Sequence, residues 1–411
     1  MFLLDQLLRR LVREGPLTVV DHHGREHAYG APHAAVRPVA IRLQDARTER
    51  ALALNPRLAV GEAYMDGRLT IEDGDVLDFM RLVTFNARWE RGGDRRRAIR
   101  RRGPKIMKMM GLKNRQPQAR RNVAHHYDLS GALYDLFLDR DRQYSCAYFT
   151  DPANSLEQAQ ADKKAHIAAK LHLKPGQRVL DIGCGWGGMA LYLHAKAGVD
   201  VTGITLSTEQ LEVARARAAQ AGVSDHVRFE LLDYRAVEGR FDRIVSVGMF
   251  EHVGPRNYDV FFQTCRRLLQ ADGVMLLHTI GKMGKPGSTD PWVQKYIFPG
   301  GYIPALSEIA AASERAKLIA ADVETLRLHY GYTLLHWLER ARAAKAEIVR
   351  LYDERFFRMW EFYLAGAATS FENGSGCNYQ IQYIRERRTL PITRDYMARD
   401  ELGLREPVGP G

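Results

Sequence analysis

The stretch Val179-Leu-Asp-Ile-Gly-Cys-Gly-Trp-Gly-Gly188 constrains the fold of this chain more than any other feature. An apolar run leads to one carboxylate, Asp181, and then Gly183, Gly185 and Gly187 stand at alternate positions. Glycine lets a ligand approach the backbone closely, and the start of a helix offers free N–H groups. The pattern therefore predicts a strand, a tight turn and a helix that together bind a nucleotide-sized cofactor.

The glycines alone leave the cofactor open, because Gly183, Gly185 and Gly188 also satisfy the G-x-G-x-x-G dinucleotide pattern. A dinucleotide site usually has an acidic residue at the end of its second strand, where it binds the ribose hydroxyls. Here the second strand closes on Thr205, and its only acid, Asp200, stands at the beginning. The sequence favours S-adenosylmethionine over NAD, and a tight turn without a ligand is the remaining alternative.

At 411 residues and 45% hydrophobic composition, the chain can bury one large core and a smaller second one. Its four cysteines include no C-x-x-C pair, so we expect neither a disulfide framework nor a metal site. The apolar N-terminus contains Asp5 and Gln6 and lacks a small-residue cleavage site, unlike a signal peptide. No uncharged run approaches the ~18 residues that span a bilayer. These features predict a cytoplasmic protein.

The net charge of +11 is concentrated in one segment. Residues 91–121 hold thirteen Lys or Arg and one acid, Asp94, a local +12 that leaves the rest of the chain near −1. A solvated linker, an anionic bilayer partner or a nucleic acid partner each explains such a run. Met107 and Met109 among the lysines suit a lipid interface, and the absence of aromatic residues there counts against stacking on single-stranded bases.

Hydrophobic patterns divide the chain into three parts. Residues 1–90 predict a small α+β domain that is structural or docks on a membrane, and residues 91–121 form the basic linker. From residue 122 to 411, helices alternate with apolar strands, which predicts a doubly wound parallel sheet with helices on both faces. The expected strands are 178–182, 199–204, 227–232, 242–248, 273–280, 321–327 and 377–384. A capping box of Ser207 and Gln210 is expected to start the helix 209–220.

Ligands of doubly wound sheets bind beyond the carboxyl ends of the strands. The residues near these ends, which we expect to face one crevice, are Gly183, Thr205, Asp233, Glu251 and His278. Asp233 can accept a hydrogen bond from an adenine amino group while Tyr234 covers the ring, although a simple turn explains Asp233 equally well. Glu251, rather than His252, is the acid expected in the cleft. His278 alone would be a core residue, but its place near a strand end favours function.

A set of longer motifs lies between residues 122 and 395. They are Ala124-His-His-Tyr-Asp-Leu129, Tyr144-Ser-Cys-Ala-Tyr148, Leu180-Asp-Ile-Gly-Cys-Gly-Trp-Gly187, Gly203-Ile-Thr-Leu-Ser207, Asp242-Arg-Ile-Val-Ser246, Phe250-Glu-His-Val-Gly254, Ile297-Phe-Pro-Gly-Gly-Tyr-Ile-Pro304 and His329-Tyr330. With these motifs the chain resembles the bacterial cyclopropane-fatty-acyl-phospholipid synthases, also called mycolic-acid-type cyclopropane synthases. The N-terminal domain and linker also resemble those of the branch that acts on phospholipids.

The resemblance implies a class I methyltransferase fold, S-adenosylmethionine as donor and the cis double bond of a phospholipid acyl chain as acceptor. The residues expected to bind the cofactor are Tyr144, Ser145, Asp181, Gly183, Gly185, Gly187, Thr205, Gln210, Asp233, Tyr234 and Arg235. Cys146, Glu251, His278, Tyr330 and the backbone of Ile280 match positions that hold a bicarbonate ion in the family. The partners implied are an unsaturated phospholipid, the anionic inner face of the cell membrane and a second copy of the chain, without nucleic acid.

The implied mechanism suits these residue types. Methyl transfer to an alkene leaves a carbocation that water would trap, so the pocket must be dry, and a base such as bicarbonate must then remove a proton to close the ring. The chain departs from some relatives at Ala367, where they have a cysteine once proposed as catalytic, and Cys377 is no substitute. The alternative function is a fatty-acyl C-methyltransferase, which yields a methyl-branched or methylene lipid without closing the ring.

Overall fold

The computed structural model describes residues 1–91 and 131–405. Within these limits the chain forms two compact units, which are described separately below. The first contains residues 1–91, 289–299 and 331–376, and the second contains 131–288, 300–330 and 377–405. The expected basic linker after Arg91 and the motif 124–129 lie outside the described residues. The sequence had assigned 289–299 and 331–376 to the catalytic domain, because no local pattern connects them with residues 1–91.

A seven-stranded sheet with the order β10-β11-β9-β8-β5-β6-β7 forms the centre of the second unit. Its strands are β5 (Arg178–Ile182), β6 (Asp200–Thr205), β7 (Val227–Leu231), β8 (Phe241–Val247), β9 (Leu269–Lys282), β10 (Ile319–Leu326) and β11 (Gly376–Ile384). The strand positions expected from the sequence are therefore confirmed. The strands from β9 to β7 run parallel, but β11 is antiparallel to β10, so the sheet is mixed where a purely parallel one was expected.

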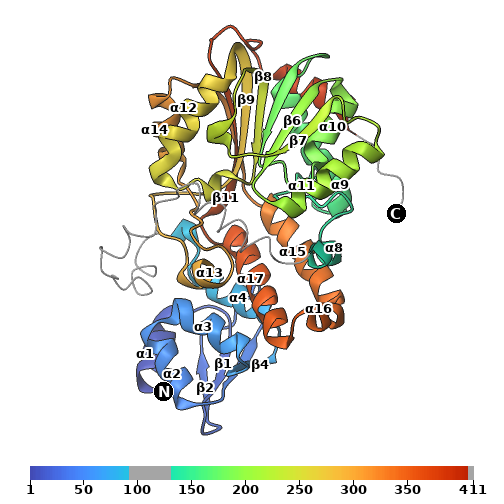
Figure 1. Cartoon of the computed structure of the whole chain (residues 1–411). Helices are drawn as coiled ribbons and strands as arrows, with labels where there is room; N and C mark the ends of the chain where they lie inside the picture. Colours follow the sequence, from blue (N-terminus) through green and yellow to red (C-terminus); the bar gives the residue numbers. More distant parts are fainter. Residues whose placement is uncertain (92–130, 406–411) are drawn as a thin grey trace. The chain divides into compact units, whose positions relative to one another are not determined.

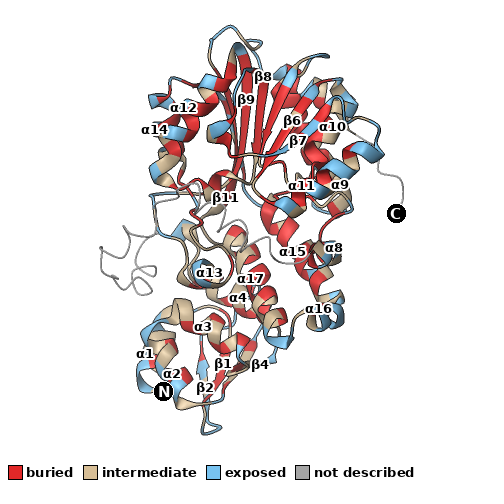
Figure 2. Ribbon diagram, viewed as in Figure 1, coloured by how far each residue is buried: buried red, intermediate tan, exposed pale blue. Residues whose placement is uncertain are grey.

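Helices cover both faces of this sheet, because successive side chains of a central strand point to opposite sides. Val179 belongs to the core beneath α9 (Leu156–Leu171), α10 (Gly188–Ala197) and α11 (Thr208–Gln220). Leu180 belongs to the core beneath α12 (Tyr258–Leu268) and α14 (Leu306–Arg315). Figure 1 shows these two helical layers with the sheet between them. In Figure 2 the central strands are coloured as buried over most of their length. The short α8 (Gly131–Phe137) and the late α18 (Asp395–Leu404) complete the unit.

A four-stranded sheet with the order β2-β1-β3-β4 organises the N-terminal part of the first unit. Its strands are β1 (Leu17–Val20), β2 (Glu26–Tyr29), β3 (Val39–Leu43) and β4 (Leu69–Asp73). Four helices accompany it: α1 (Phe2–Leu11), α2 (Ala46–Leu54), α3 (Pro56–Met65) and α4 (Val76–Asn86). Their apolar faces share one core with the strands, which gives the small α+β domain expected from the sequence.

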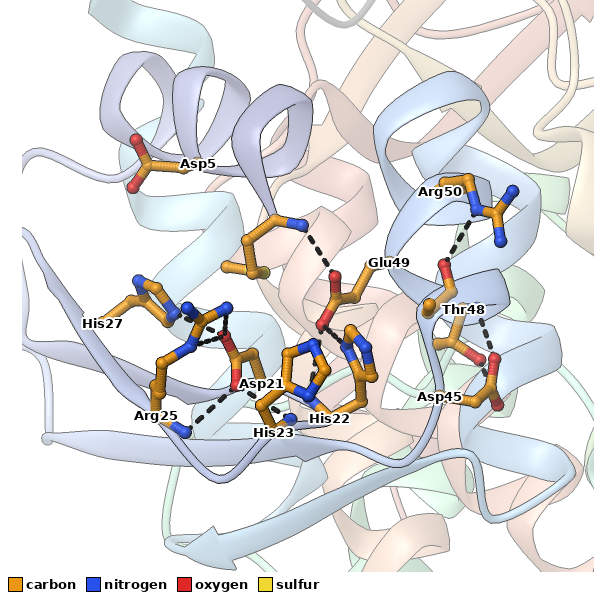
Figure 3. A network of polar contacts seen from close by, with 12 residues as sticks. Asp5, Asp21, His22, His23, Arg25, His27, Asp45, Thr48, Glu49 and Arg50 are labelled. Atoms are coloured by element: carbon orange, nitrogen blue, oxygen red, sulfur yellow. Dashed lines mark hydrogen bonds and ion pairs between the residues drawn. The ribbon is translucent and has the colours of Figure 1, made fainter.

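Two buried carboxylates organise a polar network in this domain, shown in Figure 3. Asp21 follows β1 and accepts hydrogen bonds from the backbone of His23 and from the side chains of Arg25 and His27. Glu49, on α2, accepts from the ring of His22 at 2.7 Å and from the α-amino group of Met1 at 2.7 Å. The network ties the turn after β1 and the helix α2 together.

Later helices complete the first unit: α13 (Pro291–Tyr296), α15 (His329–Ala343), α16 (Lys345–Leu351) and α17 (Glu354–Glu372). The first two residues of α15 belong to the second unit. α17 packs on α3 and α4, where Arg81 pairs with Glu372 at 2.8 Å and the Tyr64 hydroxyl donates to Glu361 at 2.6 Å. No helix among residues 1–91 and 131–405 has the length and apolar character needed to cross a bilayer.

Candidate active site

The glycine loop after β5 leaves open space where a ligand can approach the backbone. Gly185 has φ +55°, and no atom of the described residues lies within 4 Å of the place where a Cβ would stand. Gly183 has φ +85°, and its Cβ would lie 2.9 Å from the side chain of Met249. Gly187 would place a Cβ 2.7 Å from Phe229, so its lack of a side chain serves packing at the start of α10. Of the expected glycines, Gly185 is the one whose surroundings are open within the part of the chain that the structure describes.

Asp181 lies in β5 just before this loop, opposite Gly203 of β6 and Val245 of β8. Its side chain is buried, and Oδ2 has no hydrogen-bond partner in the described part of the chain. Burial raises the pKa of this carboxyl to about 7. A buried polar atom without a partner is rare in folded proteins, which marks Asp181 as a group able to receive a ligand.

Thr205 and Gln210 lie together at the end of β6. Ser207 caps α11 by accepting from the Gln210 backbone N–H at 3.3 Å, as the capping-box pattern predicts. The other half of the box does not form, because the Gln210 side-chain oxygen accepts from the Thr205 hydroxyl at 2.9 Å. Both side chains are buried. The structure therefore brings these two predicted cofactor residues into direct contact.

The corner after β7 is held together by its own residues. Asp233 caps a short 3-10 helix, Tyr234–Ala236, and forms an ion pair with Arg235 at 2.6 Å. The ring of Tyr234 belongs to the core, where it meets Phe261 edge-on at 5.4 Å. These contacts show that the corner has a structural role. The assignment of Asp233, Tyr234 and Arg235 to the cofactor stays a prediction.

The Tyr144 to Cys146 segment lies beside the loop that follows β8. A Cβ on Gly248 would stand 3.6 Å from that of Ser145. The half-buried Tyr144 meets Tyr134 edge-on at 5.3 Å. Cys146 is buried, and its thiol donates to the Ala147 carbonyl at 3.3 Å. Because burial raises the pKa of this thiol, Cys146 is a poor nucleophile at neutral pH.

Glu251 follows β8 in a single 3-10 turn, Phe250–His252, and is buried. Its Oε1 accepts from the backbone N–H of Ile280 at 2.5 Å. The nearby Thr279 hydroxyl donates to the Ile280 carbonyl at 3.1 Å, and Oε2 of Glu251 has no hydrogen-bond partner among the described residues. Burial raises the pKa of Glu251 to about 7, so a fraction of this carboxyl keeps its proton near neutral pH.

His278 lies in β9 opposite Val247, the last residue of β8. Its ring is buried between two amides of β11: Nε2 lies 2.6 Å from Nδ2 of Asn378, and Nδ1 lies 3.1 Å from Nε2 of Gln380. Burial lowers the pKa of His278, so the ring is neutral. A neutral imidazole has one donor and one acceptor nitrogen, so only one of these amide nitrogens can donate to the ring. The protonated ring nitrogen needs an acceptor, and the side-chain oxygens of Asn378 and Gln380 are both buried without a partner among the described residues, so turning one amide over supplies it.

Tyr330 is buried in the first turn of α15. The preceding residue, His329, accepts through Nδ1 from the backbone N–H of Phe149 at 3.0 Å. The ring of Tyr148 stacks on His329, with 5.0 Å between their centroids, and on His166, with 4.0 Å. These contacts connect the start of α15 with the segment that contains Cys146, although the two are far apart in sequence.

Sequence reasoning missed several polar residues that support the site. Asn378 and Gln380 occupy alternate positions in a strand that was read as merely apolar, and a period-2 run of amides was the available signal. Lys163 is fully buried in α9, a position that its helix sequence does not reveal. All four cysteines are buried and free, and residues 1–91 and 131–405 contain no cluster of His, Cys, Asp and Glu suited to a metal.

The chain is similar in sequence to known proteins. The family model "Mycolic acid cyclopropane synthetase" matches residues 114–381. The "Cyclopropane-fatty-acyl-phospholipid synthase" of Escherichia coli K12 is 40% identical over 348 residues, which cover 85% of this chain and 88% of that protein. A "Probable fatty acid methyltransferase" of Pseudomonas putida is 38% identical over 357 residues, which cover 83% of this chain and 86% of that protein.

A solved structure agrees with these sequence matches. It is the mycolic acid cyclopropane synthase CmaA1 complexed with SAH and CTAB, which is 34% identical and aligns with a TM-score of 0.61 over 64% of this chain and 97% of its own. The class I methyltransferase fold and an enzyme that uses S-adenosylmethionine, both expected from the sequence, are confirmed. The chain belongs to the mycolic acid cyclopropane synthetase family.

Proposed function

We propose that this enzyme transfers a methylene group from S-adenosylmethionine to the cis double bond of an unsaturated phospholipid acyl chain and closes a cyclopropane ring. The name of the Escherichia coli relative supports this substrate. The structural observation that carries the proposal is Glu251, a buried carboxyl with one unpartnered oxygen near the carboxyl end of β8. Ring closure requires that a proton be removed in a site without water, and a buried carboxyl such as Glu251 can take up or release a proton there.

The residues around the glycine loop fit the cofactor. When bound, S-adenosylmethionine supplies an electrophilic methyl group. Gly185 borders the open space for it, and Asp181 offers the unpartnered Oδ2 to a donor of the ligand. Ser145 adds a hydroxyl next to the loop after β8, and Thr205 and Gln210 line the end of β6. We assign these five residues to cofactor binding.

Bicarbonate fits this site through Glu251. When bound, bicarbonate supplies a base for the proton of the added methyl group. A Glu251 that keeps its proton can donate from Oε2 to the anion, which avoids repulsion between two negative charges. The Ile280 N–H already donates to Glu251, and both ring nitrogens of His278 lie against amide NH₂ groups, so their participation requires an exchange of hydrogen bonds. Cys146 and Tyr330 complete the proposed set.

The location follows from the same proposal. We propose that the enzyme is a homodimer and a peripheral protein at the inner face of the cell membrane, and that the positive charge of the sequence 91–121 contributes to attraction by anionic lipid. Sedimentation of the protein with anionic and with neutral vesicles, at rising salt concentration, tests membrane binding. Light scattering tests whether the protein is a dimer. Binding to oligonucleotides in preference to anionic vesicles would contradict it.

The decisive experiment incubates the purified protein with S-adenosylmethionine and vesicles of a cis-unsaturated phospholipid. Mass analysis of the acyl chains before and after hydrogenation then follows the product. A gain of one carbon with no remaining double bond is the expected result. A product that gains one carbon and still takes up hydrogen identifies the C-methyltransferase alternative. Unaltered lipid refutes both.

A further inference from the structure

Lys163 is a fully buried cation whose contacts all lie near the proposed cofactor site. It stands on α9, and its Nζ donates to the side-chain oxygen of Gln143 at 2.7 Å and to the Ser145 hydroxyl at 2.9 Å. No acidic group lies within ion-pair distance of it in the described part of the chain, although the carboxyls of Asp139 and Asp141 act on it from farther away and its own field reaches Asp181 and Cys146. Two neutral partners are an unusual environment for a buried ammonium.

A second residue of the same helix face holds the same segment. Gln160 lies three residues before Lys163, and its Nε2 donates to the backbone carbonyls of Gln143 and Ser145 at 3.1 and 3.0 Å. One turn of α9 therefore binds Gln143 and Ser145 twice: Gln160 contacts their backbone carbonyls, and Lys163 contacts their side chains. This turn of helix fixes both the position and the rotamer of Ser145.

The direction of the Lys163 hydrogen bond matters for Ser145. A hydroxyl has one proton and two lone pairs, and an ammonium can only donate. Lys163 therefore occupies a lone pair of Ser145, and the hydroxyl proton must point elsewhere. Among described residues, Lys163 is the hydrogen-bond partner of this hydroxyl, and Gly248 without a side chain lies next to it. Ser145 is thus prepared to donate to a ligand.

We infer that Lys163 is a positioning residue that fixes Ser145 as a hydrogen-bond donor to an anionic group of the cofactor. The inference rests on the proposed cofactor site. It adds Lys163 as a residue that acts on that site through Ser145. A carboxylate is the anionic group of S-adenosylmethionine. Lys163 does not touch the cofactor in this scheme, because Ser145 stands between them.

The burial of Lys163 supports a role other than stability. Burial lowers its pKa to about 8, so the ammonium still predominates at neutral pH but is costly to desolvate. Replacing a buried charge by an apolar side chain of similar shape is often neutral or stabilising. A purely structural Lys163 would therefore leave cofactor affinity unchanged when replaced by Met, whereas a positioning residue would not.

The test measures the affinity of the full chain for S-adenosylhomocysteine by calorimetry in four proteins: wild type, Lys163→Met, Ser145→Ala and the double variant. Each single substitution is expected to weaken binding about tenfold or more, since one charge-assisted hydrogen bond is lost. The double variant is expected to bind no more weakly than the weaker single one, because both changes remove the same interaction. The KM for lipid should not change.

Lys170→Met is the matched control. Lys170 is also buried on α9, but it pairs with Glu324 and does not contact the segment 143–145. Its loss should leave the affinity for S-adenosylhomocysteine unchanged, whatever its effect on the melting temperature.

Normal affinity in Lys163→Met, or losses that add in the double variant, would overturn the inference. If Lys163→Met does not fold, normal affinity in Ser145→Ala overturns it independently. A wild-type protein that binds no S-adenosylhomocysteine refutes the proposed cofactor site and the inference with it. Wild-type binding with normal binding in the variants refutes the inference alone.

Discussion

In the N-terminal sheet domain, the buried carboxylates Asp21 and Glu49 have hydrogen-bond partners on both oxygens (Figure 3). At the carboxyl edge of the seven-stranded sheet, the buried carboxyls of Asp181 and Glu251 each keep one oxygen without a partner among the described residues. Burial opposes ionisation in both regions. In the N-terminal domain, however, the hydrogen bonds outweigh it and hold the pKa values of Asp21 and Glu49 below their usual range.

The difference separates carboxylates that the fold itself satisfies from those that we propose to take part in function. Both oxygens of Asp21 and of Glu49 accept hydrogen bonds from groups of the same chain. These carboxylates therefore stabilise the fold and are not available to bind a ligand. Burial without sufficient partners raises the pKa values of Asp181 and Glu251 to about 7, which costs stability and leaves a proton to exchange. The predictions below test this contrast, beginning with the largest expected effect.

Glu251→Gln should reduce turnover by about 10²- to 10⁴-fold, because Gln can still donate a hydrogen bond to bicarbonate but can neither take up nor release a proton. Gln keeps an acceptor for the Ile280 N–H, so the loop should retain its geometry. Affinity for S-adenosylhomocysteine should stay near that of the wild type. Turnover is measured by acyl-chain mass analysis and affinity by calorimetry, with Asp21→Asn as the control. An equal loss of turnover and affinity would argue against the role.

The same variant should gain stability at alkaline pH. A carboxyl whose pKa rises on folding destabilises the folded state progressively, from no cost below the unfolded value of 4.5 to the full cost above about 7. Glu251→Gln should therefore unfold at a higher denaturant concentration than the wild type at pH 8, by at most about 3 kcal/mol. At pH 4 the two should coincide. A variant that is less stable than the wild type at pH 8 would show that both oxygens of the Glu251 carboxylate have hydrogen-bond partners in solution.

Asp21→Asn should have the opposite sign. Asn brings an NH₂ group toward Arg25 and His27, and the loss of charge-assisted hydrogen bonds should cost about 1–3 kcal/mol at pH 7. Because the pKa of Asp21 is lowered on folding, this stability is present above the unfolded value of 3.8 and fades as pH falls below it. Denaturant titrations at pH 7 and pH 3 measure the change. Turnover should be unaffected, and a large loss of turnover would break the contrast.

Ala367→Cys should have the smallest effect. Ala367 is half-buried on α17 in the first unit and belongs to neither group of carboxyls. Introducing a cysteine there should change the free energy of unfolding by no more than about 0.5 kcal/mol and leave turnover as it is. A marked rise in turnover would mean that a thiol at this place contributes to the reaction.

Much of the fold was predictable because its signals are local. Apolar runs of strand length, glycine turns and the Ser207 cap are readable without knowledge of contacts, and each expected strand of the seven-stranded sheet is present. The antiparallel direction of β11 was not predictable, since the helical segment 331–376 that precedes it gives no direction. The grouping of that segment with residues 1–91 depends on packing between distant parts of the chain.

For the proposed site, the sequence could predict which strand ends come together. Parallel strands bring their carboxyl ends to one edge, so Glu251 and His278 were expected together, and the backbone bond from Gly248 to His278 shows that the ends of β8 and β9 meet. The partners of each side chain were not predictable. Asn378 is 100 residues from His278, and Lys163 is 18 residues from Ser145.

The sequence by itself determined the class of fold and the family, and it predicted the edge of the sheet where we propose that chemistry occurs, because those depend on spacing along the chain. Only the tertiary structure decided which polar groups have hydrogen-bond partners. Both oxygens of Asp21 have donors, one oxygen each of Glu251 and Asp181 has none among the described residues, and the buried Lys163 donates to Ser145. Hydrogen-bond partners depend on proximity in space, and strand order and helix packing create that proximity between residues that no local pattern connects.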